Sequence, residues 1–236
     1  MEDFNPPLLY TIHCKMKKVT ILFFALVFAF CETYAQQREI SLGTKVGHNV
    51  VFGNYSALSV AGSYTHNHWG VRGGGEYNNI GRIATELRPA YYRNYHFGRL
   101  SGELLLHYTK QSQVAYSAFG AGASLDTKHL WVTFGYYHRT IAMSGERLQE
   151  PFNFYYEAGI RCLPNKERWK LDVIFSNSRM FELERHYQPT YIVEGGWQPS
   201  ERLSLDLSIN YKPAGMFHMS SNYYQFYTKL GVCYRW

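Results

Sequence analysis

Hydrophobic and polar residues alternate with a period of two along most of the chain, and the alternation is clearest in residues 223–236. One set of positions there is apolar apart from a threonine and comprises Tyr224, Phe226, Thr228, Leu230, Val232, Tyr234 and Trp236. The positions between them include charge, amide and glycine. Since successive side chains of a strand point to opposite faces, this stretch predicts a β-strand with one apolar face.

The same alternation recurs in short segments that are separated by turn residues. It predicts an all-β chain of about twelve strands, each of about nine to eleven residues, which is the length of a tilted strand that crosses a bilayer. The expected strands cover residues 39–46, 55–64, 69–77, 83–92, 100–108, the two halves of 115–140, 152–162, 169–178, 187–197, 203–212 and 223–236.

The clearest hairpin covers residues 115–140. A two-residue turn at Thr127 and Lys128 would place Leu125 opposite Leu130, with further small residues opposite large ones along both faces. Such pairing favours this register.

The connections between the strands alternate in length. Residues 94–99, 127–128, 164–168 and 199–202 are short connections, whereas residues 141–151, 180–186 and 213–222 are predicted to be longer loops. Short turns at one end and long loops at the other are typical of transmembrane barrels. Pro89 is the exception, because a mid-strand proline cannot donate to a ladder, and it predicts either a bulge or a wrong strand assignment.

Composition supports a barrel with one face toward lipid. Aromatic residues make up 17% of the chain, yet the mean hydropathy is only -0.33, which is what alternating lipid-facing and lumen-facing positions produce. The formal net charge of +6 comes without a nucleic-acid-binding motif. A barrel that faces anionic lipid headgroups accounts for it, so we expect no nucleic-acid partner.

The first 35 residues predict a targeting segment. Lys17 and Lys18 precede an apolar run over residues 19–30, and Thr33 and Ala35 supply the small residues of a cleavage site. The run is too short to cross a bilayer as a helix. We therefore expect residues 1–15 to be an upstream extension before a natural start at Met16, residues 16–35 to be a cleaved signal peptide, and residues 36–236 to form the barrel.

The terminal strand resembles the C-terminal strand of bacterial outer-membrane β-barrels, in which alternate apolar residues lead to a terminal Phe or Trp. Tyr234 and Trp236 carry the resemblance here. It implies an antiparallel up-and-down transmembrane barrel in the outer membrane, with outer-membrane lipid and lipopolysaccharide around it. It also implies export by the general secretion machinery and insertion by the barrel-assembly machinery. Neither a narrower family nor an oligomeric state follows.

In such a barrel the inward positions carry charges of nearly balanced sign. The predicted lumen charge network comprises Glu39, Arg72, Glu86, Arg88, Glu103, Arg139, Glu157, Arg161, Asp172, Glu194 and Arg235. Three pairs fall on neighbouring strands: Arg88 with Glu103, Arg161 with Asp172, and Arg235 with Glu39 where the last strand meets the first. These charges are expected to rigidify the interior, or alternatively to select solutes.

The leading functional hypothesis is a narrow channel or a structural barrel with a salt-bridged lumen. One alternative is a lipid or lipid A hydrolase, which needs a nucleophile and a base in hydrogen-bond reach, with His107 near Glu103 and His138 near Ser144 as the inspected groups. Another is an adhesin or scaffold that binds partners through the outer loops. No catalytic residue is assigned.

A metal site is considered at one loop only. Glu182, Glu184 and His186 could bind a metal in principle, but a solvated outer loop is the favoured interpretation. We expect neither a metal nor another cofactor.

Overall fold

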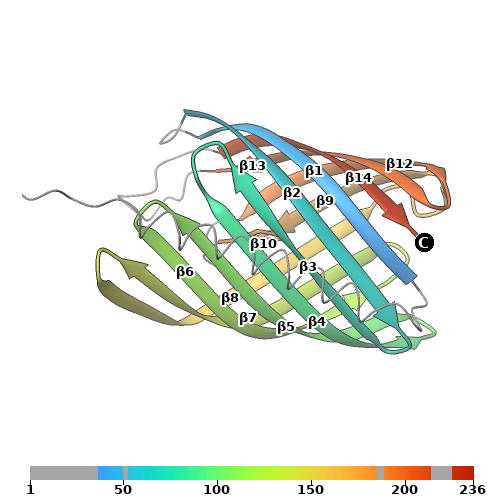
Figure 1. Ribbon diagram of the computed structural model, residues 1–236. Helices are drawn as coiled ribbons and strands as arrows, with labels where there is room; N and C mark the ends of the chain where they lie inside the picture. Colours follow the sequence, from blue (N-terminus) through green and yellow to red (C-terminus); the bar gives the residue numbers. More distant parts are fainter. Residues whose placement is uncertain (1–36, 50–52, 185–188, 214–224) are drawn as a thin grey trace, which may run out of the picture. The chain divides into compact units, whose positions relative to one another are not determined.

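The alternating segments pair into twelve antiparallel strands that close into a barrel (Figure 1). The computed structural model describes residues 37–49, 53–184, 189–213 and 225–236. The expected upstream extension and signal peptide lie outside the described residues. No helix in the described ranges is long and apolar enough to cross a membrane.

Each barrel strand pairs with its neighbour along the wall, and β14 closes on β1. The barrel strands are β1 Gln37–Asn49, β2 Gly53–His66, β3 Trp69–Asn78, β4 Ile83–Tyr95, β5 Gly98–Gln111, β6 Val114–Asp126, β7 Leu130–Met143, β8 Glu146–Arg161, β9 Trp169–Ser176, β12 Thr190–Ser200, β13 Leu203–Lys212 and β14 Gln225–Arg235. Two further short strands, β10 Ser178–Arg179 and β11 Glu182–Leu183, form a separate two-stranded sheet.

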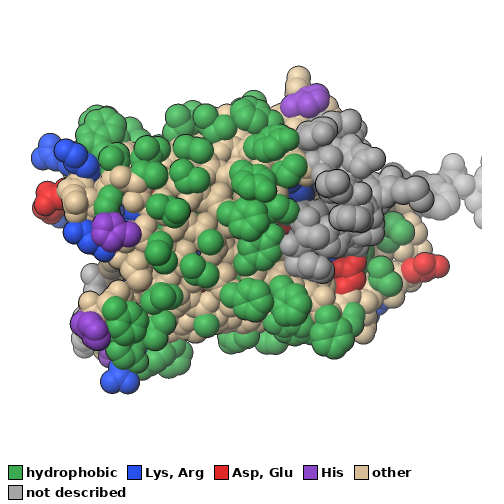
Figure 2. All heavy atoms as spheres, turned by 180° about the vertical axis from the view of Figure 1, so that it is seen from behind, with side chains coloured by type: hydrophobic (Ala, Val, Ile, Leu, Met, Phe, Trp, Pro, Cys, Tyr) green, Lys and Arg blue, Asp and Glu red, His purple; other side chains and the backbone are tan. Residues whose placement is uncertain are grey.

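The barrel has its apolar side chains outside and its charges inside. On the wall seen in Figure 2, hydrophobic side chains cover the middle and charged side chains gather at the two ends. Leu58, Phe134 and Leu230 are more than half exposed, whereas Lys45, Glu86 and Arg139 are buried. A soluble core would show the reverse, so the period-two pattern places an apolar band toward lipid.

Aromatic pairs mark the end of the barrel where both described chain ends lie, here called the terminus end. Ring centroids lie 4.9 Å apart in Trp69 and Tyr91, 6.0 Å apart in Trp169 and Trp197, and 5.9 Å apart in Tyr234 and Trp236. Amphipathic rings at this height form one of the two girdles expected of a membrane barrel.

The closure of β14 on β1 agrees with the seam predicted from the sequence. Glu39 lies opposite Arg235, and the register runs without a shift to Asn49 opposite Gln225. Beyond the last strand, the Trp236 amide donates to the Arg38 carbonyl at 3.1 Å. The seam is therefore hydrogen-bonded like any other pair of strands.

The predicted register of the 115–140 hairpin was wrong by two residues. Leu125 lies opposite Val132 rather than Leu130, and Thr127 closes the turn with a hydrogen bond from its amide to the Leu130 carbonyl. The turn therefore extends to His129. A two-residue slip preserves which face each side chain occupies, which is why the alternation alone did not detect it.

The long loop predicted at residues 141–151 was also wrong. β7 continues to Met143 and β8 begins at Glu146, so only Ser144 and Gly145 form the turn. Both have positive φ angles, 50° and 92°, as a two-residue hairpin turn requires. A register shift between Tyr137 and Arg139 marks where the hairpin changes its pairing.

Pro89 requires neither a bulge nor a new strand assignment. It lies opposite Val71 on β3, and the β4 to β5 ladder resumes with Ala90 opposite Glu103 in the same register as Leu87 opposite Leu106. The proline therefore interrupts one ladder locally inside a continuous strand.

Candidate functional site: the constricted lumen

The connection between β9 and β12 folds into the barrel instead of extending from it. Residues 177–184, here called the lumenal segment, contain the β10 and β11 strands, which pair antiparallel. Phe181 and Leu183 are 1% and 2% exposed. The prediction of a solvated outer loop at residues 180–186 was therefore wrong for residues 180–184. Burial of the Phe181 and Leu183 side chains holds the segment inside the barrel. Residues 185 and 186 lie outside the described ranges.

Apolar contacts fix one side of the lumenal segment. Leu183 belongs to a buried cluster with Leu105, Ala118, Tyr137 and Tyr155, which project inward from β5 to β8. Phe181 lies against a glycine of β3, where an added Cβ would come within 2.9 Å of its ring. The segment packs on a wall that is locally apolar.

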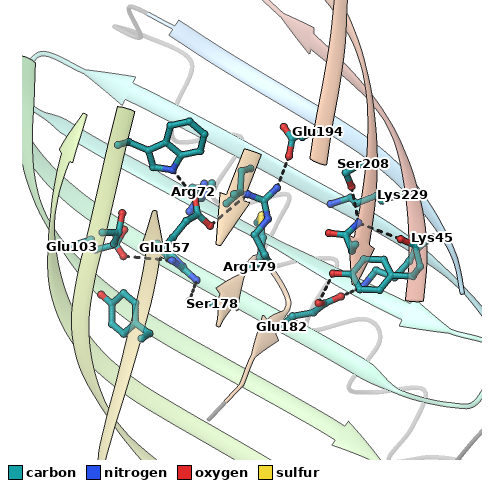
Figure 3. A pocket seen from close by; sticks show the side chains of 18 of the residues that line it. Lys45, Arg72, Glu103, Glu157, Ser178, Arg179, Glu182, Glu194, Ser208 and Lys229 are labelled. Atoms are coloured by element: carbon teal, nitrogen blue, oxygen red, sulfur yellow. Dashed lines mark hydrogen bonds and ion pairs between the residues drawn. The ribbon is translucent and has the colours of Figure 1, made fainter. Parts of the chain in front are cut away.

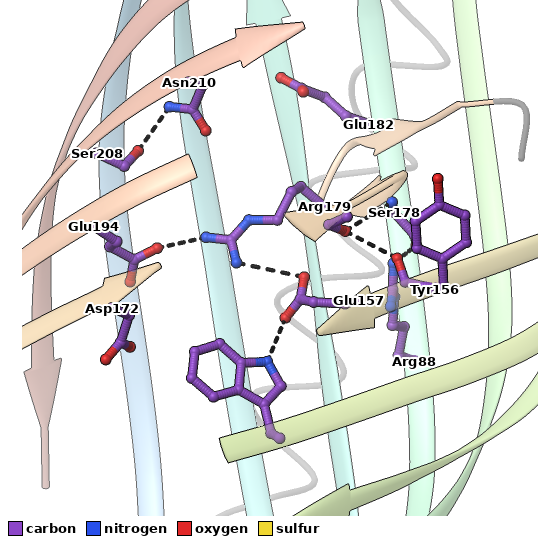
Figure 4. A network of polar contacts seen from close by, with 12 residues as sticks. Arg88, Tyr156, Glu157, Asp172, Ser178, Arg179, Glu182, Glu194, Ser208 and Asn210 are labelled. Atoms are coloured by element: carbon purple, nitrogen blue, oxygen red, sulfur yellow. Dashed lines mark hydrogen bonds and ion pairs between the residues drawn. The ribbon is translucent and has the colours of Figure 1, made fainter. Parts of the chain in front are cut away.

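Arg179 fixes the other side by bridging two strands (Figure 4). Its guanidinium lies 3.4 Å from the Glu157 carboxylate on β8 and 2.5 Å from the Glu194 carboxylate on β12. The Trp131 indole donates to Glu157 at 3.0 Å. Because the side chain is planar and presents several donors, it can bind both carboxylates at once.

Glu182 attaches the segment near the seam (Figure 3). Its carboxylate forms an ion pair with Lys45 of β1 and accepts a hydrogen bond of 2.6 Å from the Tyr227 hydroxyl of β14. Lys45 also lies 3.0 Å from Glu76. Breaking such a buried pair from one side leaves an uncompensated charge, which costs about 3–5 kcal/mol.

Three further contacts join the lumenal segment to β4, β7 and β13. Arg88 donates to the Ser178 hydroxyl at 2.8 Å, and the Glu184 carboxylate lies 2.7 Å from the Lys212 ammonium. The Tyr137 hydroxyl donates to the Glu184 carbonyl at 2.9 Å. The lumenal segment is thus bound to strands from opposite sides of the wall, so it crosses the bore.

Several of the charges predicted from sequence meet in the lumen. Arg235 lies 2.7 Å from Glu39, and Arg88 lies 3.4 Å from Glu103 and 2.7 Å from Glu86. The Arg139 guanidinium lies 2.5 Å from Glu150, a residue that the sequence assigned to a loop.

Another predicted pair is replaced. Arg161 and Asp172 are opposite each other in the ladder, but Arg161 forms its ion pair with Asp126 at 2.8 Å. Asp172 lies 3.3 Å from Lys170 of its own strand, which also contacts Glu194. Arg72 faces the lumen and forms no ion pair with a described residue.

Two adjoining cavities lie along the lumen. The central cavity has a volume of about 310 Å³, and a vestibule of about 550 Å³ leads toward the terminus end. Arg72, Lys170, Met180 and Glu194 line both. The lumenal segment therefore borders both spaces and narrows the passage between them.

His107, one of the groups considered for hydrolysis, does not lie in an accessible catalytic site. His107 lies 3.0 Å from Glu86 and 2.9 Å from the Thr109 hydroxyl, not beside Glu103 as the sequence suggested. This acid, base and hydroxyl are hydrogen-bonded in series, but the His107 side chain is fully buried. A substrate would have no route to the imidazole, and the contacts satisfy buried polar groups in the wall.

The metal-site hypothesis finds no support in the described residues. Glu182 and Glu184 are engaged by lysines, and His186 lies outside the described ranges. Within those ranges no group of three His, Cys, Asp or Glu side chains could hold a metal ion.

The residues that sequence reasoning missed are Arg179 and Glu182 as lumen groups. The segment that contains them is too short and too charged for its sequence pattern to predict a strand. The one available signal is the apolar pair Phe181 and Leu183, which a solvated loop would not be expected to carry.

Comparison with known proteins identifies the fold. No protein-family model matches the chain, and no curated protein matches it. The KdgM porin superposes with a TM-score of 0.54 at 12% identity, covering 83% of this chain and 98% of that one.

Two further solved structures are similar. The translocator domain of the autotransporter NalP from Neisseria meningitidis gives a TM-score of 0.55 at 14% identity, with 96% and 97% covered. The NanC porin gives 0.54 at 11% identity, with 82% and 98% covered. Together with the closed twelve-stranded barrel and its apolar outer face, these likenesses show that the chain has the fold of bacterial outer-membrane β-barrels.

Proposed function

We propose that the protein is a narrow outer-membrane channel whose bore is constricted by the lumenal segment. The observation that carries the proposal is the in-folded segment itself, which crosses a charged lumen between two adjoining cavities. Two of the similar structures are named as porins, which supports a channel rather than a purely structural barrel.

The lining suits small hydrated solutes. Charged side chains of both signs face the passage, and hydrogen bonds hold many of them in place. A pore whose walls present fixed donors and acceptors replaces part of a solute's hydration, while its narrowest part sets the size limit. Here Met180 lines both cavities and Arg179 lines the central one, so displacement of the lumenal segment should widen the passage.

Conductance of the refolded protein in a planar bilayer tests the proposal. We expect the wild-type barrel to give small, discrete current steps. The double substitution Arg179→Gln and Glu182→Gln removes the ion pairs to Glu157, Glu194 and Lys45, so it should release the lumenal segment and raise the conductance severalfold.

A matched variant controls for loss of charge. Arg99 forms an exposed pair with Asp126 at the terminus-end rim, 3.2 Å apart, and Arg99→Gln should leave the conductance unchanged. If neither the wild type nor the double variant conducts at any applied voltage, while both show the heat-modifiable gel mobility of a folded barrel, the protein is a closed structural barrel and the channel proposal is wrong.

A further inference from the structure

The tip of the β7 to β8 hairpin reverses the polarity of its two faces. It lies at the end of the barrel opposite the C-terminus (Figure 1). Lower in the wall, outward side chains such as Phe119 are apolar and exposed. Toward the tip the outward rows become small or polar and consist of Ser117, Thr140 and Gln149, followed by Ala115, Ala142 and Arg147. This part of the hairpin therefore does not face the apolar interior of a bilayer.

The inward face of the same tip is apolar. The Tyr116 ring lies on that face, because it stacks on the buried His107 with ring centroids 5.5 Å apart. Residues directly opposite in a ladder share a face, and the pairing extends this one to a group that we call the tip patch: Val114, Tyr116, Ile141, Met143 and Leu148. Met143 and Leu148 are 54% and 59% exposed, so the described part of the chain leaves much of the patch uncovered.

The edge of β8 beside the tip patch has no strand partner. β9 pairs with β8 only from Glu157 to Arg161, and no described strand pairs with residues 146–153 on that side. In a two-residue hairpin the flanking residues are hydrogen-bonded to each other and the next pair is not. Arg147 and Gln149 therefore direct their amides and carbonyls away from β7. Such an unpaired edge is a template for a further strand.

The lower part of the same edge supports this assignment. The Tyr156 amide and the Phe154 carbonyl point away from β7, and the Asn177 side chain hydrogen-bonds to both. The register shift beyond Tyr137 adds one residue to β8, so the edge-facing positions change from even to odd numbers above it. Arg147 and Gln149 continue the edge without such a cap.

A strand added at this edge has to match two different faces. Its inward side chains would meet Leu148, and its outward side chains would meet Arg147 and Gln149. Arg147 is exposed and forms no ion pair with a described residue, so an acidic side chain beside it would complement its charge. An apolar solute could cover the tip patch, but it would leave the backbone edge unpaired. The two features together therefore fit a polypeptide.

We infer that the β8 edge at Arg147 and Gln149, together with the tip patch, binds an extended segment of a partner protein by strand addition. The segment alternates apolar with polar residues and has an acidic residue beside Arg147. In this mode backbone hydrogen bonds give affinity, and alternate side chains give specificity. The inference goes beyond the proposed channel, because the surface uses no lumen charge.

Fluorescence anisotropy of a labelled synthetic peptide with the detergent-folded barrel tests the inference. The probe alternates valine with threonine and has one central glutamate. We expect saturable binding of one peptide per chain. Gln149→Pro removes an amide that β7 does not use, and Leu148→Ser removes apolar contact, so each should weaken binding at least severalfold. Gln149→Ala is the matched control, since it keeps the amide, and it should bind like the wild type.

Two further arms separate strand addition from apolar contact. Arg147→Glu should weaken binding of the glutamate peptide severalfold and favour a version with lysine at that position. Methylating alternate backbone amides of the peptide keeps every side chain. Only one of the two sets of alternate amides faces β8, so methylation of that set should abolish binding and methylation of the other should not.

Equal binding of the two methylated peptides would overturn the inference, as would failure of the wild type to bind either the glutamate or the lysine peptide. Dimers of the barrel that form without peptide and dissociate in Gln149→Pro would assign the edge to a second copy and would also contradict it. Every variant should keep the heat-modifiable mobility of the wild type, because Arg147, Leu148 and Gln149 are exposed. None of these results depends on conduction, so this inference and the channel proposal can fail separately.

Discussion

At the scale of single residues, the interior depends on glycines that leave room for buried tyrosines. Tyr155 is fully buried, and a Cβ added at Gly122 or Gly135 would overlap its ring. We expect Gly135→Ala to destabilise the barrel by about 1–3 kcal/mol, the usual cost of overpacking. Urea unfolding followed by heat-modifiable gel mobility measures this change.

Gly102 provides the matched control for that substitution. A Cβ there would meet only the Gly122 carbonyl at 3.9 Å, an ordinary contact, so Gly102→Ala should have little effect. Adding Tyr155→Leu to Gly135→Ala should recover part of the loss, because it vacates the space that the methyl group needs. An additive loss in the double variant would contradict the packing explanation.

At the scale of elements, Asn177 is the residue at which the chain leaves the wall after β9. Its side chain accepts from the Tyr156 amide at 2.7 Å and donates to the Phe154 and Glu184 carbonyls at 2.8 and 3.2 Å. It thereby satisfies part of the β8 edge that the short β9 leaves unpaired.

Replacing this amide should loosen the lumenal segment. Since the side chain is buried, Asn177→Ala leaves polar backbone groups unsatisfied and should cost roughly 1–3 kcal/mol. Hydrogen exchange should rise at the Tyr156 and Glu184 amides. The exposed Asn165→Ala serves as the control. Unchanged protection in Asn177→Ala would show that the ion pairs alone hold the segment.

At the scale of the whole molecule, the seam between β1 and β14 decides whether the sheet closes. We expect the backbone pairing of β1 with β14 to supply most of the free energy of closure. The Arg235 and Glu39 side chains contribute less, because each is about one-third exposed. Screened pairs of this kind contribute about 0–1 kcal/mol. We therefore expect Arg235→Ala to lower the free energy of unfolding by less than about 1 kcal/mol in urea titrations; a larger loss would make the side-chain pair a principal closure element.

Trp236 has a different role, which we propose is recognition by the barrel-assembly machinery. Trp236→Ala should lower the amount of folded protein in the outer membrane severalfold in cells, yet refold normally in detergent. Trp197 is the matched control, since it is similarly exposed, 43% against 47%, and also stacks on an aromatic neighbour at the terminus end. Equal effects of Trp236→Ala and Trp197→Ala in cells would assign both residues to the girdle alone.

The sequence by itself determined the architecture of the wall. Period-two alternation depends only on local strand geometry, so it identified the twelve crossings, the face of Arg72 and Glu157, and the meeting of Glu39 with Arg235. The alternation located strand ends less well. The β7 to β8 hairpin continues through residues 141–151, where the apolar alternation is lost and a loop was predicted. A slip of two residues leaves every side chain on the same face, so the alternation could not determine the register of the 115–140 hairpin.

Only the tertiary structure decided the interior of the barrel. The position of residues 177–184 depends on Leu183 meeting a cluster built from β5 to β8, and on Arg179 reaching carboxylates of β8 and β12. These contacts join residues that are far apart in the chain. The free energy gained from apolar burial and charge pairing exceeds the cost of removing a charged loop from water. Which lumenal cations find carboxylate partners also follows from that placement.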